Sequence, residues 1–353
     1  MSMPDNMIRS PFHYYRDRLK DPRWVKLYTQ FEEAVFALQT KLDIPYEPWM
    51  DEMIEDCHVL HYIFERVYSD QPGMYFVNLY SAEYQHSRRK LHFRWKLMYP
   101  VDEIPVLNDK LKQELDRIAG EISAGHPGMG ELEKEKRIYD YIIKHVTYDY
   151  ATLEKTAFED VMRLGKGFEI YSIVGALLHK HAVCQGIAGM FKLLCDRFGI
   201  PAIVLTGQTE GGRHAWNMVR IGGRFYQVDC TWCLHGDWQK RATVQRYRYF
   251  NIPDSLMGLD HRSELPYMPR CWSYDQNPYK ILNLLASTVE EFEQIFLLAA
   301  KREKHYFAIL CAEPLFSAST PQSYWDGLFK RSGMRINRIL VDSTHRLQCF
   351  EKL

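Results

Sequence analysis

The chain has 353 residues, of which 46% are hydrophobic and 25% charged, and its 45 lysine and arginine residues are balanced by 45 aspartate and glutamate residues. This length usually supports two or three packed units, and 14% aromatic residues are enough for a large core. Balanced charge argues against nucleic-acid and anionic-membrane binders, which normally carry a basic excess. No apolar run reaches the roughly 18 to 20 residues that a membrane-spanning helix needs. The composition therefore predicts a soluble globular protein.

The first residues lack the apolar stretch and small-residue cleavage site of a secretory signal, so we do not expect export by that route. Disulfide frameworks concentrate in small secreted domains, whereas the eight cysteines here are scattered along a large chain. They stand at positions 57, 184, 195, 230, 233, 271, 311 and 349. This distribution indicates reduced thiols in the cytoplasm.

The N-terminal part has the pattern of helices followed by two strands. Apolar residues recur at helical spacing over residues 24–42 and 50–67. After the turn signal Ser-Asp-Gln-Pro-Gly, residues 74–80 predict a strand, and alternation over residues 91–99 predicts its hairpin partner. Basic and aromatic residues interleave over residues 88–96, but the period of two explains them better as two faces of a strand than as a nucleic-acid platform.

A glycine-rich segment over residues 120–130 predicts a domain boundary near residue 130. We therefore expect three parts: an N-terminal helical region with a hairpin (1–130), a central domain (131–279) and a small C-terminal α/β unit of unknown role (280–353). The predicted elements beyond the boundary are helices over 131–146, 289–299 and 324–330, a strand over 306–311, and a hairpin of 336–341 with 346–350.

Cys184 stands just before a run of helical apolar periodicity that ends at Gly199, with Pro201 as a stop signal. The cysteine would lie in the first turn, where backbone N–H groups and the positive end of the helix dipole favour an anion. A helix N-terminus is one of the environments that lower a thiol pKa and generate a nucleophilic thiolate. Gly186 and Gly189 would let another backbone or a substrate approach closely.

The segment from residue 213 to residue 232 has the pattern of a β-hairpin whose turn is Gly222-Gly223. If Ile221 pairs with Arg224, His214 and Asp229 become diagonal neighbours on one face, so that the carboxylate can orient the imidazole. Singly, a helical cysteine is usually a small core residue, and a strand histidine is usually structural. Together, Cys184, His214 and Asp229 supply the nucleophile, base and orienting group of thiol acyl transfer.

These segments resemble a known family. The sequences Ala-Val-Cys-Gln-Gly, His-Ala-Trp-Asn and Val-Asp-Cys-Thr-Trp, in this order and spacing, are similar to the core of bacterial-type members of the transglutaminase-like superfamily. The resemblance is strongest over residues 133–261, where it also includes residues 145–150, 172–178, 198–207 and 247–261. It implies an α+β protein with a papain-like core, in which a helix carrying the cysteine packs on an antiparallel sheet carrying the histidine and the aspartate. The family's Cys-His-Asp triad falls on Cys184, His214 and Asp229.

The resemblance implies attack by Cys184 on a peptide or carboxamide carbonyl and a thioester intermediate. Resolution by water would make the protein a peptidase or amidase, and resolution by an amine would make it a transglutaminase. The alternative is an inactive transglutaminase-like module that binds or scaffolds other proteins. Two positions depart from the family pattern. Ile187 stands where family members often have an aromatic residue, and Cys233 stands where an acidic residue often follows the motif that contains Asp229 and Trp232. Leu178 stands where a papain-like glutamine would have been expected.

Other candidate sites are weaker. Cys230 and Cys233 form a single CxxC pair that could bind zinc with Cys271 or His235, but zinc normally needs four ligands. His179 and His181 lie on different faces of a helix and are interpreted as solvated or capping residues. Trp216 and Trp232 are interpreted as walls of the core or of the cleft. The sequence has no phosphate-binding loop and implies no cofactor and no metal, only a peptide or protein substrate; it does not indicate an oligomeric state.

Overall fold

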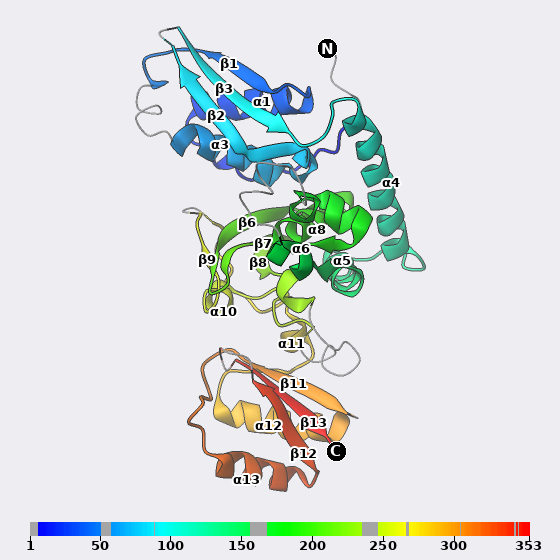
Figure 1. The fold of residues 1–353 in the computed structure, drawn as a ribbon. Helices are drawn as coiled ribbons and strands as arrows, with labels where there is room; N and C mark the ends of the chain where they lie inside the picture. Colours follow the sequence, from blue (N-terminus) through cyan, green and yellow to red (C-terminus); the bar gives the residue numbers. More distant parts are fainter. Residues whose placement is uncertain are drawn as a thin grey trace. The chain divides into compact units, whose positions relative to one another are not determined.

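The computed structural model describes residues 6–50, 58–87, 89–155, 168–234, 246–265, 268–303, 305–341, 344 and 346–353. Their contacts divide the chain into two compact units. Unit 1 is Met1–Leu205 with Ala215–Asn217, and unit 2 is Thr206–His214 with Met218–Leu353. Helices and strands are mixed in both units (Figure 1), which confirms the predicted α+β class. The predicted boundaries at residues 130 and 279 stay predictions.

Unit 1 begins with two helices beside a three-stranded sheet of order β1-β3-β2. The elements are α1 (Pro22–Phe36), β1 (Lys41–Pro45), α3 (His58–Asp70), β2 (Val77–His86) and β3 (Lys90–Leu97). The sheet and helices meet through aromatic rings: the centroid of Phe93 on β3 lies 4.8 Å from that of Phe31 on α1 and 5.2 Å from that of Phe64 on α3. The alternation in the sequence of β3 thus marks its buried face, as predicted.

Three details of this region correct the sequence predictions. The helix predicted over residues 24–42 ends at Phe36, because Leu38 adopts a left-handed conformation with φ 56° and the chain then enters β1. Strand β1 pairs with β3, so the predicted hairpin is part of a sheet of three strands. Strand β2 begins only at Val77, because Pro72–Met74 form a 3-10 turn. In the helix predicted over residues 50–67, residues 51–57 lie outside the described part of the chain.

The remainder of unit 1 is mainly helical. Its elements are α4 (Glu103–Ser123), α5 (Glu131–His145), α6 (Tyr150–Lys155) and α8 (Cys184–Arg197), with the short strands β4 (Thr147–Tyr148) and β5 (His181–Ala182). Helix α5 confirms the prediction for residues 131–146, whereas α4 was not predicted. The segment of the family resemblance over residues 172–178 forms a short helix: a 3-10 turn (Phe168–Tyr171) precedes it, its last turn is π-helical (Gly175–His179), and Lys180, at φ 58°, ends it.

A second sheet has the strand order β8-β7-β6-β9. Its strands are β6 (Ala202–Thr209), β7 (Gly212–Ile221), β8 (Arg224–Val228) and β9 (Arg262–Ser263), and β6 and β7 contribute residues to both units. Gly222 and Gly223 have φ 57° and 81°, so the predicted two-residue turn between β7 and β8 is confirmed. Two short helices follow in unit 2, α10 (Asp254–Met257) and α11 (Pro278–Ile281).

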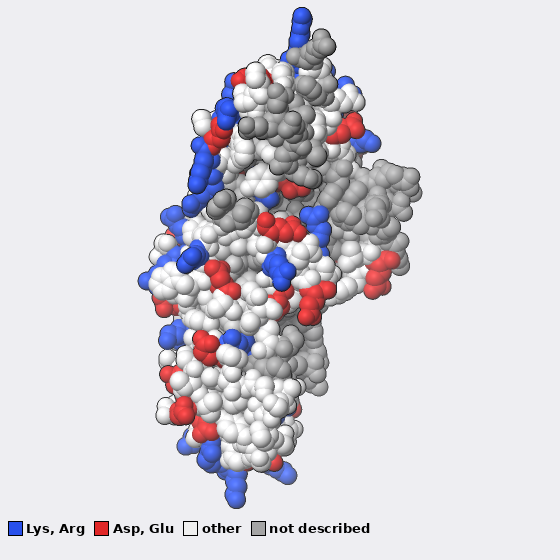
Figure 2. All heavy atoms as spheres, turned by 90° about the vertical axis from the view of Figure 1, so that its left-hand side faces the viewer, with Lys and Arg blue, Asp and Glu red and all other residues white. Residues whose placement is uncertain are grey.

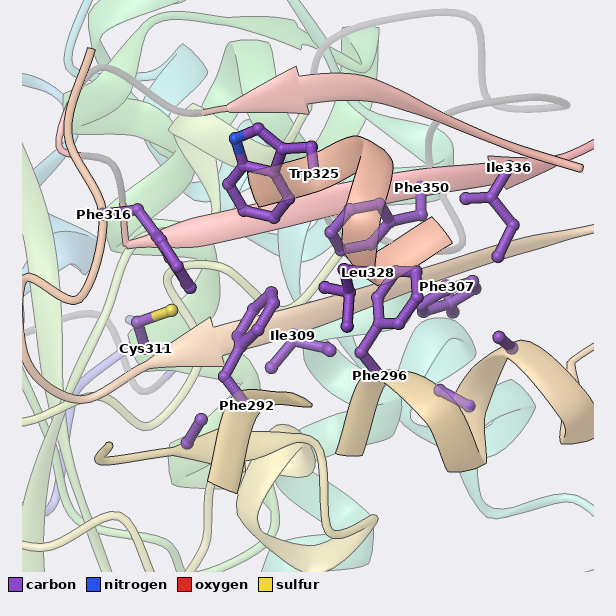
Figure 3. Packing of buried hydrophobic residues seen from close by; sticks show 13 residues of the cluster. Phe292, Phe296, Phe307, Ile309, Cys311, Phe316, Trp325, Leu328, Ile336 and Phe350 are labelled. Carbon is purple, nitrogen blue, oxygen red and sulfur yellow. The ribbon is translucent and has the colours of Figure 1, made fainter. Parts of the chain in front are cut away.

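The C-terminal part of unit 2 is a four-stranded sheet of order β10-β11-β13-β12 with two helices. The elements are β10 (Leu285–Ala286), α12 (Val289–Arg302), β11 (Tyr306–Cys311), α13 (Gln322–Ser332), β12 (Ile336–Val341) and β13 (Leu347–Lys352). Figure 3 shows the aromatic side chains of both helices converging on the sheet, with Phe292, Phe296 and Trp325 around Phe350. All the predicted elements of this region are present, and only β10 was missed.

None of the helices in the described ranges is both long and apolar enough to cross a membrane. On the face displayed in Figure 2, basic and acidic side chains are mixed.

Candidate active site

Cys184 is the first residue of α8, as the sequence predicted. Val183 before it has an extended backbone and supplies no side-chain cap, and the first turn holds no acidic residue. The backbone N–H groups of this turn are therefore not neutralised by a neighbouring carboxylate of the same helix. The start of α8 is therefore a place where the helix favours an anionic group.

Exposure sets Cys184 apart from the other cysteines. Among the seven cysteines in the described residues it is half-buried, and the other six are buried. Burial raises the pKa of Cys195, and also that of Cys271, so both are held as thiols. Cys184 packs against a small cluster formed by Ala188, Val204 and Ala215. Cys57 lies outside the described residues.

The start of α8 is held close to the preceding loop at Gly186. A Cβ atom at this position would lie 2.5 Å from the backbone oxygen of Ser172 and 3.0 Å from that of Ile170. The same loop also accepts a hydrogen bond of 2.8 Å, from the N–H of Val183 to the oxygen of Ile170. Glycine is therefore required here by close backbone approach, as the sequence suggested.

Replacing Gly186 by alanine is expected to destabilise the protein by about 1 to 3 kcal/mol, because the added methyl group forces the backbone apart. The matched control is Gly120→Ala in α4, where the new Cβ would meet nothing within 4 Å. That change should stabilise the protein by about 0.5 to 1 kcal/mol through helix propensity. Urea unfolding of both variants measures the difference, and two shifts of the same sign would contradict the packing argument.

His214 lies on β7 and forms a buried pair with Asp229. Its Nε2 atom is 2.8 Å from Oδ2 of Asp229, and the side chains are 6% and 0% exposed. Asp229 is one residue beyond the end of β8 and not on the strand itself, because the chain turns there into the 3-10 turn Thr231–Cys233. Oδ1 of Asp229 accepts hydrogen bonds from the backbone N–H groups of Thr231 and Trp232, at 2.7 and 3.3 Å. The carboxylate is thus fixed by its own turn.

Burial alone would raise the pKa of Asp229, but the positive charges of two histidines and their hydrogen bonds outweigh this effect and hold the pKa below its usual range. Asp229 is therefore ionised and can only accept hydrogen bonds. Its contact with His214 must then be an Nε2–H···O bond. This bond leaves Nδ1 as the ring nitrogen that can exchange a proton when the imidazole is neutral.

The second histidine, His261, was not singled out from the sequence. Its Nε2 atom lies 3.1 Å from the same Oδ2 atom of Asp229, and its Nδ1 atom lies 2.6 Å from Oδ1 of Asp260. Burial by itself would lower the pKa of His261, whereas these two carboxylates raise it above the ordinary value. The only sequence signal was the pair Asp260-His261 within the segment that resembles the transglutaminase-like family.

Asn217 is another buried residue whose role only the structure shows. Its amide nitrogen donates to the backbone oxygen of Ala188 on α8, at 3.1 Å, and to that of Ile203 on β6, at 3.2 Å. The asparagine of the His-Ala-Trp-Asn motif thus ties the Cys184 helix to the sheet. This bond explains why a polar residue is tolerated in the core at this point of β7.

Of the remaining candidates, Trp232 lies beside the site, with its ring centroid 5.8 Å from that of His214, whereas the other histidines and cysteines do not join it. His179 is exposed and lies 3.2 Å from Glu169, and His181 is exposed and bonded to Thr147 at 2.7 Å. Of the cysteines considered for zinc, Cys230 and Cys233 are buried around the 3-10 turn after Asp229, and His235 lies outside the described residues.

A metal ion is one way to explain a cluster of ligand-type side chains. Among the described residues, such atoms lie within 4.8 Å of one another in the group His214, Asp229 and His261. Both nitrogen–oxygen distances to Asp229 are those of hydrogen bonds, and the far nitrogen of His261 already faces a carboxylate. Hydrogen bonds account for the arrangement of these side chains.

Comparison with known proteins finds a family model that matches the segment containing the candidate site. Residues 116–230, which include Cys184, His214 and Asp229, match the model of the transglutaminase-like superfamily. The kyphoscoliosis peptidases of Homo sapiens and Mus musculus are 28% and 27% identical to this chain in alignments of 114 residues that cover 29% of this chain and 16% of each relative. The chain therefore matches only a small part of these relatives. A crystal structure of a TGase shares 17% identity and a TM-score of 0.31 over 42% of this chain and 44% of its own.

Proposed function

Because residues 116–230 belong to the transglutaminase-like superfamily, we propose that this protein is a cysteine-dependent enzyme that transfers or hydrolyses an acyl group of a peptide or carboxamide through a thioester on Cys184. Cys184 would be the nucleophile, His214 the proton carrier and Asp229 the group that orients His214. The observation that carries the proposal is the buried His214–Asp229 pair, whose 2.8 Å bond directs Nδ1 of the ring away from the carboxylate.

Two features of unit 1 support Cys184 as the nucleophile. It is the one partly exposed cysteine of the described set, and it is the first residue of helix α8. Ala215, which directly follows His214 in the chain, belongs to the small cluster against which Cys184 packs. The proposal requires that Nδ1 of His214 and the Cys184 sulfur come within hydrogen-bond reach.

The proposed reaction can be written with the substrate, water or an amine, and these three residues alone. Nδ1 of His214 takes the thiol proton, and the sulfur of Cys184 forms a bond to the carbonyl carbon of the substrate. The imidazolium then returns the proton to the departing amine nitrogen as the carbon–nitrogen bond breaks, which leaves the thioester. Water or a second amine attacks the thioester, gives its proton to His214, and releases the sulfur as thiol. Asp229 holds the ring in one tautomer through both steps.

Alkylation of the native protein tests the proposal. We expect iodoacetamide near pH 7 to modify Cys184 about 10-fold faster than any other cysteine, and about 10-fold faster than it modifies Cys184 in a His214→Ala variant, because an ordinary thiol is only a few per cent thiolate at this pH. Mass spectrometry of peptides gives the rates. The matched control is His181→Ala, which removes an exposed histidine three residues before Cys184. Equal rates in the native protein and His214→Ala would instead favour an inactive binding module.

A second assay separates the two reactions. The protein is incubated with a labelled primary amine and a glutamine-containing protein substrate, and both amine incorporation and peptide cleavage are measured. Incorporation that disappears in Cys184→Ala identifies a transglutaminase. Cleavage without incorporation identifies a peptidase, because water then resolves the thioester in place of the amine.

A further inference from the structure

His261 lies beside the residues of the proposed triad and has no role in the mechanism so far. The inference that follows rests on the proposed function, since it concerns the same site. We propose that His261 is a positioning residue: as an imidazolium held between Asp229 and Asp260, it fixes the Asp229 carboxylate and weakens the affinity of His214 for a proton.

Hydrogen-bond chemistry requires the charge on His261. Its two ring nitrogens lie 3.1 and 2.6 Å from oxygens of two different aspartates, and ionised carboxylates only accept hydrogen bonds. A neutral imidazole has one N–H, so one of the two contacts would then place a lone pair against a carboxylate oxygen. A doubly protonated ring satisfies both. The side chain of His261 is fully buried, so no solvent competes for these bonds.

The carboxylate on the far side of His261 is itself held. Oδ2 of Asp260 accepts a hydrogen bond of 2.6 Å from the hydroxyl of Tyr249 and lies 3.8 Å from Nη2 of Arg248. A hydroxyl donor and a guanidinium group thus flank the Asp260 carboxylate on the side away from His261. The charged groups therefore alternate in sign from Arg248 through Asp260 and His261 to Asp229, which contacts His214. Besides these groups, the rings of Trp232 and Tyr249 face His261, with centroids 4.4 and 5.5 Å away.

This arrangement affects His214 in two ways. Its partner oxygen, Oδ2 of Asp229, also accepts the hydrogen bond from His261, so the carboxylate is held from two directions and cannot rotate away. In addition, the centroid of the His261 ring is 5.3 Å from that of His214. Protonation of His214 would therefore place a second positive charge next to the charge on His261. His214 is thereby kept in the neutral form that accepts the thiol proton, which a triad with a single histidine would achieve less readily.

The test is nuclear magnetic resonance of the full chain labelled with ¹⁵N-histidine, in a Cys184→Ala background in which the thiol cannot affect His214. We expect both ring nitrogens of His261 to remain protonated through neutral pH, with the proton lost only well above the ordinary histidine range near 6.5. We expect His261→Gln to raise the midpoint of the His214 titration by about one pH unit, since the like charge is removed. His179→Gln, at an exposed position in unit 1, is the matched control and should leave that midpoint unchanged.

Asp260→Asn is the second variant and retains the histidine. It should lower the midpoint of the His261 titration, because an amide can donate to Nδ1 and no longer requires the imidazolium. If His261→Gln does not fold, this variant still assigns and tests His261. A neutral His261 at pH 7, or a His214 midpoint that does not move when the charge of His261 is removed, would overturn the inference. Because Cys184 is absent, these results do not depend on the proposed catalysis, which the alkylation rates judge separately.

Discussion

Replacing Asp229 by asparagine is expected to reduce the acylation of Cys184 by about 10²- to 10⁴-fold while the protein remains folded. In the native site Oδ1 accepts two backbone N–H groups, so the asparagine oxygen is expected at that position and its NH₂ group would face His214. The NH₂ group would donate to Nε2 and force the proton of His214 onto Nδ1. That tautomer cannot take the proton of the thiol.

The measurement is the burst of nitrophenol released when p-nitrophenyl acetate acylates the enzyme, with Cys184→Ala as the blank. Asp254→Asn is the matched control. Asp254 is a carboxylate of the same unit that accepts from the side chain of Gln227 and the backbone N–H of Cys271, at 2.9 Å each, and no histidine pairs with it in the described structure. Asp229→Asn with a burst rate within threefold of the native rate, and with an unchanged unfolding midpoint, would show that Asp229 does not orient the catalytic base.

Replacing Lys192 by alanine is expected to have the largest effect on stability, a loss of about 3 to 5 kcal/mol. Lys192 lies on α8 and is 1% exposed, and its Nζ atom donates to Oγ of Ser10 at 2.8 Å and to the backbone oxygen of Ala202 at 3.1 Å. It also lies 3.6 Å from a carboxylate oxygen of Asp196, which is 6% exposed. Removal of the ammonium group would leave this carboxylate buried without its cation.

Urea unfolding of Lys192→Ala measures the loss, and Lys110→Ala, at an exposed position of α4, should change stability by less than about 0.5 kcal/mol. A double variant, Lys192→Met with Asp196→Leu, should recover most of the lost stability, because it removes both charges and keeps apolar volume. A loss below 1 kcal/mol in Lys192→Ala, or a double variant no more stable than the single one, would contradict the role of the buried pair.

Local patterns in the sequence were enough to predict several elements. Helix α8 begins at Cys184 because the apolar period of its residues, and the glycine and proline after it, act within a few residues. The turn at Gly222 and Gly223 and the elements of residues 289–350 follow from equally local signals. The positions of Cys184, His214 and Asp229 relative to these elements could therefore be assigned from the chain alone, with an error of one residue at the end of β8.

Long-range contacts were decided by tertiary structure. Strand β1 lies in a pattern that also suits a helix, and its pairing with β3, about 50 residues away, settles the choice. His261 meets Asp229 across 32 residues, and Lys192 meets Ser10 across 182 residues. Such buried polar groups must find partners, but the partner is whichever residue the packing of distant segments places within about 3 Å. The sequence by itself predicted the candidate residues Cys184, His214 and Asp229 from local patterns, while only the folded chain decided that a second histidine shares the carboxylate of Asp229.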